Sequence, residues 1–198
     1  MRISRNRSFL LFLPLLFGAL SVIPSANAIS FDTTLSSLNE VPPAIPSTGS
    51  GFATVDLTGN LLTVNVTFTG LATPVLAGHI HCCSALGTNI GVAVGFSGLP
   101  ANATSGTFMQ TFDLTNAAVY SAGFLNNFGG GTAAGAQAAL IAGMSGGLAY
   151  VNLHNSAFPG GEIRGQLATV PEPGSAAMLV MGLAGLLVLR RRDRKSVV

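Results

Sequence analysis

The chain has 198 residues, of which 48% are hydrophobic and only 8% are charged. Eight of its nine Lys and Arg residues cluster near the two ends, and residues 29–169 contain a single cation, Arg164, and five Asp and Glu residues. That segment has a formal charge of −4 with neutral histidines. This balance argues against nucleic acid as a partner, because phosphate binding needs clustered Lys and Arg, and the apolar content argues against disorder.

Residues 1–28 are predicted to be a secretory signal peptide. Three arginines precede an apolar run over residues 9–20, and Ala26-Asn27-Ala28 matches the small-residue pattern of a cleavage site. We therefore expect cleavage after Ala28 and export of one domain spanning residues 29–169, long enough to bury a sizeable core. A retained membrane anchor is the alternative interpretation of this run.

The exported domain alternates apolar and polar residues as strands do. The clearest strand covers residues 62–69 and is predicted to form a hairpin with residues 52–57 across the turn signal Thr58-Gly59-Asn60. Further strands are predicted at residues 31–38, 75–81, 90–95, 106–112, 147–154 and 162–168. About eight short strands predict an all-β fold, an antiparallel sandwich or barrel.

Two stretches are predicted to be short helices. Residues 115–126 have Asp113 or Thr115 as a candidate N-cap. Residues 132–144 are rich in alanine and place apolar side chains on one stripe, formed by Ala136, Leu140 and Met144.

The segment His79-Ile80-His81-Cys82-Cys83 holds two of the three histidines and both cysteines. In a strand, His79, His81 and Cys83 share one face, because side chains alternate. Imidazole and thiolate bind copper or zinc, so these residues and His154 are candidate ligands of a metal site, with Glu162 as another candidate for the fourth ligand. The alternative is a structural role, in which the histidines hydrogen-bond the backbone at strand ends.

Cys82 and Cys83 have no distant cysteine as a partner. Adjacent Cα atoms lie about 3.8 Å apart, below the usual disulfide range of ~4.4–6.8 Å, although an oxidising compartment favours the bond. A disulfide between the two neighbours, a cross-link to another chain and thiolate ligation all remain open, and we place the disulfide first.

Arg164 lies between Glu162 and Gln166 in the last predicted strand. A buried arginine needs a partner, because an unpaired buried charge is costly. Glu162 is one candidate and Glu40 is the other, since the stiff pair Pro42-Pro43 follows it. We hypothesise that Arg164 clamps the first motif of the domain to the last.

The C-terminal residues 170–198 have three parts in order: Pro171-Glu172-Pro173, an apolar run over residues 174–189 and an Arg-rich end. As a helix at about 1.5 Å per residue the run would be shorter than a bilayer core, but it could span a thinned one. The basic end would stay cytoplasmic. The tail resembles a PEP-CTERM sorting signal, which implies a bacterial protein that an exosortase-type membrane protease cleaves near the Pro-Glu-Pro motif. A permanent anchor is the alternative.

Four motifs carry a second resemblance: Glu40-Val41-Pro42-Pro43, His79-Ile80-His81, the segment 150–154 and the segment 158–167. Together they resemble the CHRD domain over roughly residues 31–168. The resemblance implies an antiparallel β-sandwich of immunoglobulin-like or superoxide-dismutase-like shape, but no established activity. Copper–zinc dismutases use about twice as many histidines, so dismutation is not expected.

Enzymatic catalysis finds little support in the sequence, because no G-x-S-x-G elbow occurs and the five carboxylates of the domain match no catalytic motif. We expect a non-enzymatic protein, anchored in the inner membrane during sorting and then delivered to the cell surface or extracellular matrix. Exopolysaccharide or other surface proteins are its expected partners. The alternative function is a copper- or zinc-binding, redox-related domain that uses His79, His81 and His154.

Overall fold

The computed structural model describes residues 28–42, 46–171 and 181–184. The predicted signal peptide except its last residue, Ala28, lies outside these residues, as do Glu172 and Pro173 of the sorting motif and most of the apolar run 174–189. Within them, no helix has the length and apolar character needed to cross a membrane. The strands are β1 (Ala28–Ser36), β2 (Ser50–Thr58), β3 (Leu61–Thr69), β4 (Val75–Cys82), β5 (Val92–Gly95), β6 (Gly106–Asp113), β7 (Ala149–Asn155), β8 (Ile163–Gln166) and β9 (Ala168–Val170). The helices are α1 (Ala122–Asn127) and α2 (Ala133–Ser145), with short 3-10 turns η1 (Ser37–Asn39) and η2 (Ala117–Val119).

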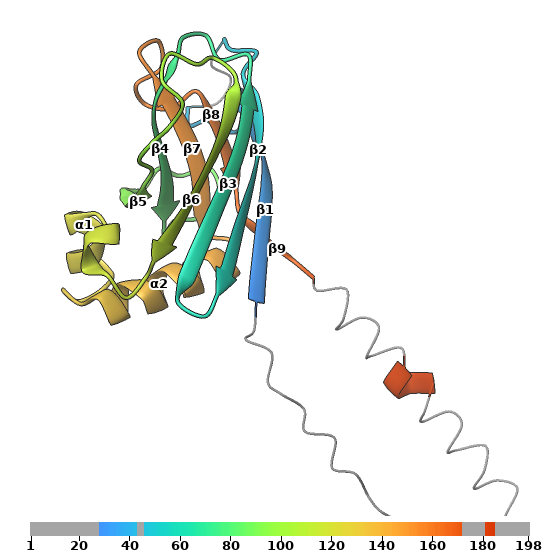
Figure 1. The fold of residues 1–198 in the computed structure, drawn as a ribbon, viewed down its shortest axis with the longest axis vertical. Helices are drawn as coiled ribbons and strands as arrows, with labels where there is room; N and C mark the ends of the chain where they lie inside the picture. Colours follow the sequence, from blue (N-terminus) through green and yellow to red (C-terminus); the bar gives the residue numbers. More distant parts are fainter. Residues whose placement is uncertain (1–27, 43–45, 172–180, 185–198) are drawn as a thin grey trace, which may run out of the picture.

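The strands pair antiparallel in the order β5-β4-β7-β8-β1-β2-β3-β6, and β9 also pairs with β1. The all-β prediction is confirmed, but hydrogen bonds join all nine strands into one curled sheet (Figure 1) rather than two separate sheets. The reason is a break at Leu167, which divides the C-terminal strand. The first part, β8, pairs with β7 and meets β1 at Ser36, whereas β9 pairs with β1 farther along.

The predicted hairpin is confirmed, since β2 and β3 pair in unbroken register from Ser50↔Thr69 to Thr58↔Leu61. Helix α2 matches the predicted helix, with Thr132 as N-cap. The predicted helix 115–126 is instead divided into η2 and α1. Ser121 separates them, because its extended backbone and its hydroxyl, which accepts from the Phe124 N–H, start a new helix there.

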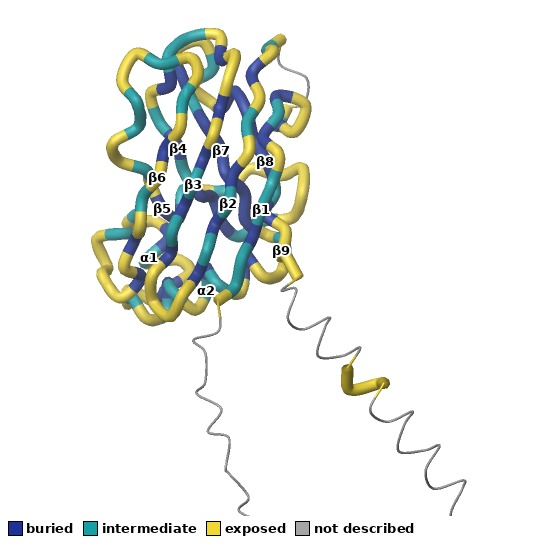
Figure 2. The backbone as a smooth tube through the Cα atoms, turned by 45° about the vertical axis from the view of Figure 1, so that its right-hand side comes forward, coloured by how far each residue is buried: buried dark blue, intermediate teal, exposed yellow. Residues whose placement is uncertain are grey.

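The core lies inside the curled sheet, and α1 and α2 cover one end of it (Figure 1). The predicted stripe of α2 is buried there, and Figure 2 shows the buried backbone running along the middle of the sheet. Alternation then divides β4 and β7. Ile80, Val151 and Leu153 belong to the core, so their neighbours in sequence project from the opposite face of the sheet. The histidines lie on this second face.

Candidate metal centre

The register of β4 and β7 assembles the three histidines on one face of the sheet. Ala77 pairs with His154, His79 pairs with Asn152, and His81 pairs with Tyr150. One ring nitrogen from each histidine lies within 4.8 Å of the others. The structure therefore brings together the three histidines that the sequence singles out, although 73 residues separate His81 from His154.

Hydrogen bonds fix the tautomers of two of these rings. Nδ1 of His81 lies 2.7 Å from the carbonyl oxygen of Ile90, and Nδ1 of His154 lies 3.1 Å from that of Pro159. A carbonyl oxygen only accepts, so each Nδ1 carries the hydrogen and each Nε2 of the neutral ring keeps a lone pair. Both Nε2 atoms, and Nδ1 of His79, are buried without a hydrogen-bond partner among the described residues.

The environment holds the rings neutral. Burial, together with the smaller effects of the neighbouring His154 and His81, lowers the pKa of His79 to about 4. Burial also lowers the pKa of His81 to about 4, against the opposing effect of its hydrogen bond to Ile90. The pKa of His154 is lowered by burial as well. Neutral imidazole is the form that binds metal ions, so all three rings are available as ligands at neutral pH.

An aromatic stack holds His81 in place. Its ring lies parallel to that of Tyr150, with centroids 4.6 Å apart and an interplanar angle of 4°. The Cζ atom of Arg164 lies 3.4 Å from the centroid of the same Tyr150 ring. Strands β4 and β8 flank β7, so His81 and Arg164 approach Tyr150 from opposite sides. The stack thus fixes the orientation of His81, one of the candidate metal ligands.

Arg164 is 1% exposed, as its predicted role requires, but its hydrogen bonds differ from the predicted ion pair. Its guanidinium donates to Asn89 Oδ1 at 2.8 Å and to the Thr88 carbonyl oxygen at 2.7 Å. Asn89 in turn donates to the Val41 carbonyl oxygen at 3.0 Å, and Asn39 donates to the Arg164 carbonyl oxygen at 3.0 Å. The first motif is thus tied to the last strand through amide side chains rather than through Glu40 or Glu162.

Glu162 is fully buried and engaged elsewhere. Its carboxylate accepts from the Ala72 N–H at 2.8 Å and from the side chains of Ser47 and Asn155. These three donors come from segments far apart in the sequence, so Glu162 joins loops of the domain. The structure does not bring it to the histidines.

The two cysteines are joined to each other in a disulfide. Both sulfur atoms lie against α2, since a Cβ built on Gly143 would stand 2.2 Å from Cys82 Sγ and 2.5 Å from Cys83 Sγ. The prediction from strand alternation that Cys83 shares a face with the histidines is therefore wrong. The alternation ends with β4 at Cys82, and the bond carries the Cys83 sulfur to the side of the Cys82 sulfur.

Sequence reasoning missed the partnership of Asn152 and Glu40 beside the histidines. They are 3% and 4% exposed, and Asn152 Nδ2 donates to Glu40 Oε2 at 3.4 Å. Burial raises the pKa of Glu40 to about 7, against the lowering effects of the Arg164 charge and the Asn152 hydrogen bond. Strand alternation could have found Asn152, because it shares a face with Tyr150 and His154.

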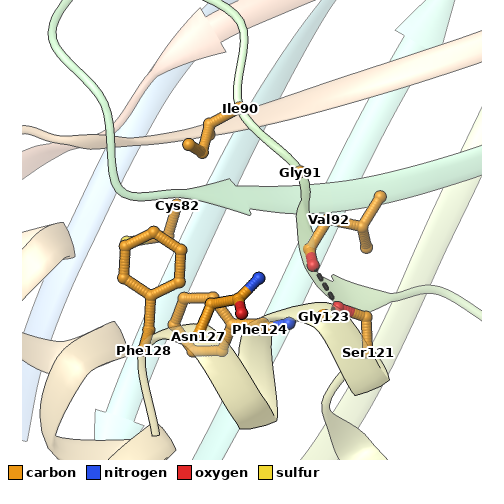
Figure 3. A pocket seen from close by; sticks show the side chains of 9 residues that line it. All are labelled: Cys82, Ile90, Gly91, Val92, Ser121, Gly123, Phe124, Asn127 and Phe128. Atoms are coloured by element: carbon orange, nitrogen blue, oxygen red, sulfur yellow. Dashed lines mark hydrogen bonds between the residues drawn. The ribbon is translucent and has the colours of Figure 1, made fainter.

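A separate cavity of about 340 Å³ lies between α1 and the end of β4, beside Cys82 (Figure 3). Phe124 and Phe128 line it with aromatic rings, and the Ser121 hydroxyl at its edge donates to the Val92 carbonyl oxygen. The cavity offers shape and apolar surface but no cluster of unpaired polar groups. The chemistry of the domain is therefore concentrated at the three histidines.

Comparisons with known proteins agree with both resemblances. The CHRD domain family matches residues 31–167, and the PEP-CTERM protein-sorting motif matches residues 169–195. No curated protein and no solved structure shows significant similarity to the chain. Since the first match covers more than half of the sequence, the chain belongs to the CHRD domain family, and it ends in a PEP-CTERM sorting motif.

Proposed function

We propose that this protein is an exported CHRD domain that binds one copper or zinc ion through His79, His81 and His154. The PEP-CTERM motif implies export and processing by an exosortase-type membrane enzyme. Delivery to the cell surface or matrix, by way of an inner-membrane intermediate with a cytoplasmic C-terminus, is part of the proposal. So is a non-enzymatic role there, in which the ion is held rather than used in catalysis.

The observation that carries the proposal is the set of three buried ring nitrogens without partners. An unpaired buried polar atom costs about 1–3 kcal/mol, so three at one place call for a ligand. The Nε2 atoms of His81 and His154 each carry a lone pair, and with the hydrogen of His79 on its Nε2 a single cation accepts lone pairs from all three rings. Both copper and zinc accept imidazole ligands, and the carbonyl partners of His81 and His154 are the outer contacts that orient such ligands.

The spacing of the rings sets a further expectation. Bonds of about 2.0–2.1 Å to a tetrahedral zinc ion place neighbouring ligand nitrogens about 3.3–3.4 Å apart. In the structure one nitrogen of each ring lies within 4.8 Å of the others. Binding therefore requires the most widely separated pair of nitrogens to move closer by up to about 1.4 Å through rotation of the side chains.

Elemental analysis of the full chain, purified without a histidine tag, tests the proposal. The chain has three histidines and all lie at the site, so no other imidazole competes for the ion. We expect about one copper or zinc ion per chain, lost in His154→Ala. Asp113→Asn, which alters an exposed carboxylate outside the cluster, serves as the control. Absence of metal, or full retention in His154→Ala, would reject the proposal.

A further inference from the structure

The partnerless atoms near the histidines share one chemical property. Besides the ring nitrogens, the buried side-chain atoms without a partner among the described residues are Glu40 Oε1, Asn152 Oδ1 and Gln166 Oε1. The last two are the acceptor atoms of amides whose NH₂ groups already donate, to Glu40 Oε2 and to the Gly147 carbonyl oxygen. The partnerless side-chain oxygens of these residues are thus all acceptors that no described group satisfies.

Asn152 is the residue of this set that borders the metal centre. It pairs directly with His79 across the β4–β7 register and lies two residues from His154 on the same face of β7. His81 is its diagonal neighbour on β4. Side chains in such positions lie within reach of one another, so the register places the side chain of Asn152 next to the three histidines.

Glu40 joins Asn152 from the first motif. The partnerless oxygens of both residues lie within 2.8 Å of the position that a Cβ on Gly161 would take. Gly161 has a φ of +129°, a conformation open to glycine, and lets its loop close over the pair. A cavity of about 260 Å³, lined by Glu40, Gly161 and neighbouring loop residues, lies on the outer side of this pair.

We propose that the metal ion holds a small hydrogen-bond donor as its fourth ligand, water in the resting protein, and that Asn152 Oδ1 and Glu40 Oε1 accept its hydrogens. This inference rests on the metal binding proposed above. Three protein ligands leave one position of a tetrahedral ion open. Two neighbouring acceptors match the two hydrogens of water and resolve two buried atoms that otherwise lack partners.

The same arrangement selects a class of exchangeable ligand. Water, ammonia and primary amines bring hydrogens toward the two oxygens. Azide and halide ions bring lone pairs and negative charge toward a buried carboxylate, and like charges repel strongly where water is excluded. The site therefore favours neutral donors over small anions.

Pulsed electron paramagnetic resonance of the Cu²⁺-loaded full chain, in H₂O and in D₂O, tests the first part. We expect strongly coupled exchangeable deuterons from a ligand in the first coordination sphere. Copper bound by the histidines without such deuterons would overturn the inference while leaving metal binding intact. The absence of such deuterons is expected if a protonated Glu40 donates from Oε1 to Asn152 Oδ1, because the two atoms then satisfy each other without a ligand. Failure to bind copper or zinc at all would instead reject the proposed function.

Azide titration of the Cu²⁺-loaded chain, followed by its charge-transfer absorption, tests the second part. Above the pKa of Glu40 of about 7, where this side chain is ionised, we expect Glu40→Gln to bind azide at least about tenfold more tightly, because a nearby negative charge is removed. Asp56→Asn, on β2, is the matched control and should leave azide affinity unchanged. Equal affinities in wild type and Glu40→Gln would overturn the inference. If Glu40→Gln does not fold, Asn152→Asp adds a charge at the same place and must weaken azide binding.

Discussion

Gly143 gives the sharpest prediction about the packing of α2 against the disulfide. In the interior of a helix, replacing glycine by alanine ordinarily stabilises a protein by roughly 0.5–1 kcal/mol. At Gly143 the new Cβ would stand 2.2 Å and 2.5 Å from the two disulfide sulfurs and 3.4 Å from Cys83 Cβ. We therefore expect Gly143→Ala to destabilise the domain, so that the usual sign is reversed.

The magnitude follows from the overlap. Non-bonded heavy atoms sit about 3.5–4.0 Å apart at contact, so α2 or the disulfide must move by more than an ångström. Overpacking of this kind costs about 1–3 kcal/mol. Because the two sulfurs are bonded to each other and cannot turn away separately, we take the upper part of that range. After the gain in helix propensity, the net loss is about 1–2 kcal/mol, or roughly 3–8 °C in Tm.

Thermal and denaturant unfolding of the purified chain measure the effect. Gly123→Ala in α1 is the matched control, because a Cβ there meets nothing within 4 Å, and it should be neutral or stabilising. A Gly143→Ala variant at least as stable as wild type, with the disulfide intact, would refute the placement of both sulfurs against α2.

Three further predictions concern the site and the tail. Arg164→Met should lower stability by about 2–3 kcal/mol, because two hydrogen bonds and the stack on a tyrosine are lost; an unchanged thermal midpoint would contradict this. The metal-free protein should lose stability as the pH falls from about 6.5 toward 4, because His79 and His81 are protonated in the unfolded chain before the folded one. Glu40, with a folded pKa of about 7, acts in the opposite direction, since its contribution is lost as the pH rises. Urea midpoints should therefore fall more steeply with acidification in Glu40→Gln, and a flat profile in wild type would count against the buried histidines. Deleting residues 171–198 should prevent surface delivery, as cell fractionation would show, and normal delivery of the truncated chain would argue against the sorting motif.

The sequence predicts what local patterns determine. Alternation is enough for the β2–β3 hairpin, and an alanine-rich segment with an apolar stripe is enough for α2. The histidine cluster follows from alternation on β4 together with a neighbouring strand that carries His154. These features depend on residues close in sequence or on one strand pairing.

The missed features depend on tertiary contacts. The partner of Arg164 is Asn89, an exposed loop residue 75 positions away that no periodicity marks. The face of Cys83 was mispredicted because the bond to Cys82 overrides strand alternation. The single curled sheet depends on how one C-terminal strand divides at Leu167 between two neighbours.

X-ray absorption at the metal edge, on the full chain as isolated from its host, tests the central claim most directly. The proposed site predicts a bound copper or zinc ion with three imidazole nitrogens at about 2.0–2.1 Å, one further light-atom ligand and the outer-shell scattering of imidazole rings. The disulfide and its position against α2 predict that no sulfur is bound. A sulfur neighbour at about 2.3 Å, or coordination by oxygen without imidazole, would contradict the account.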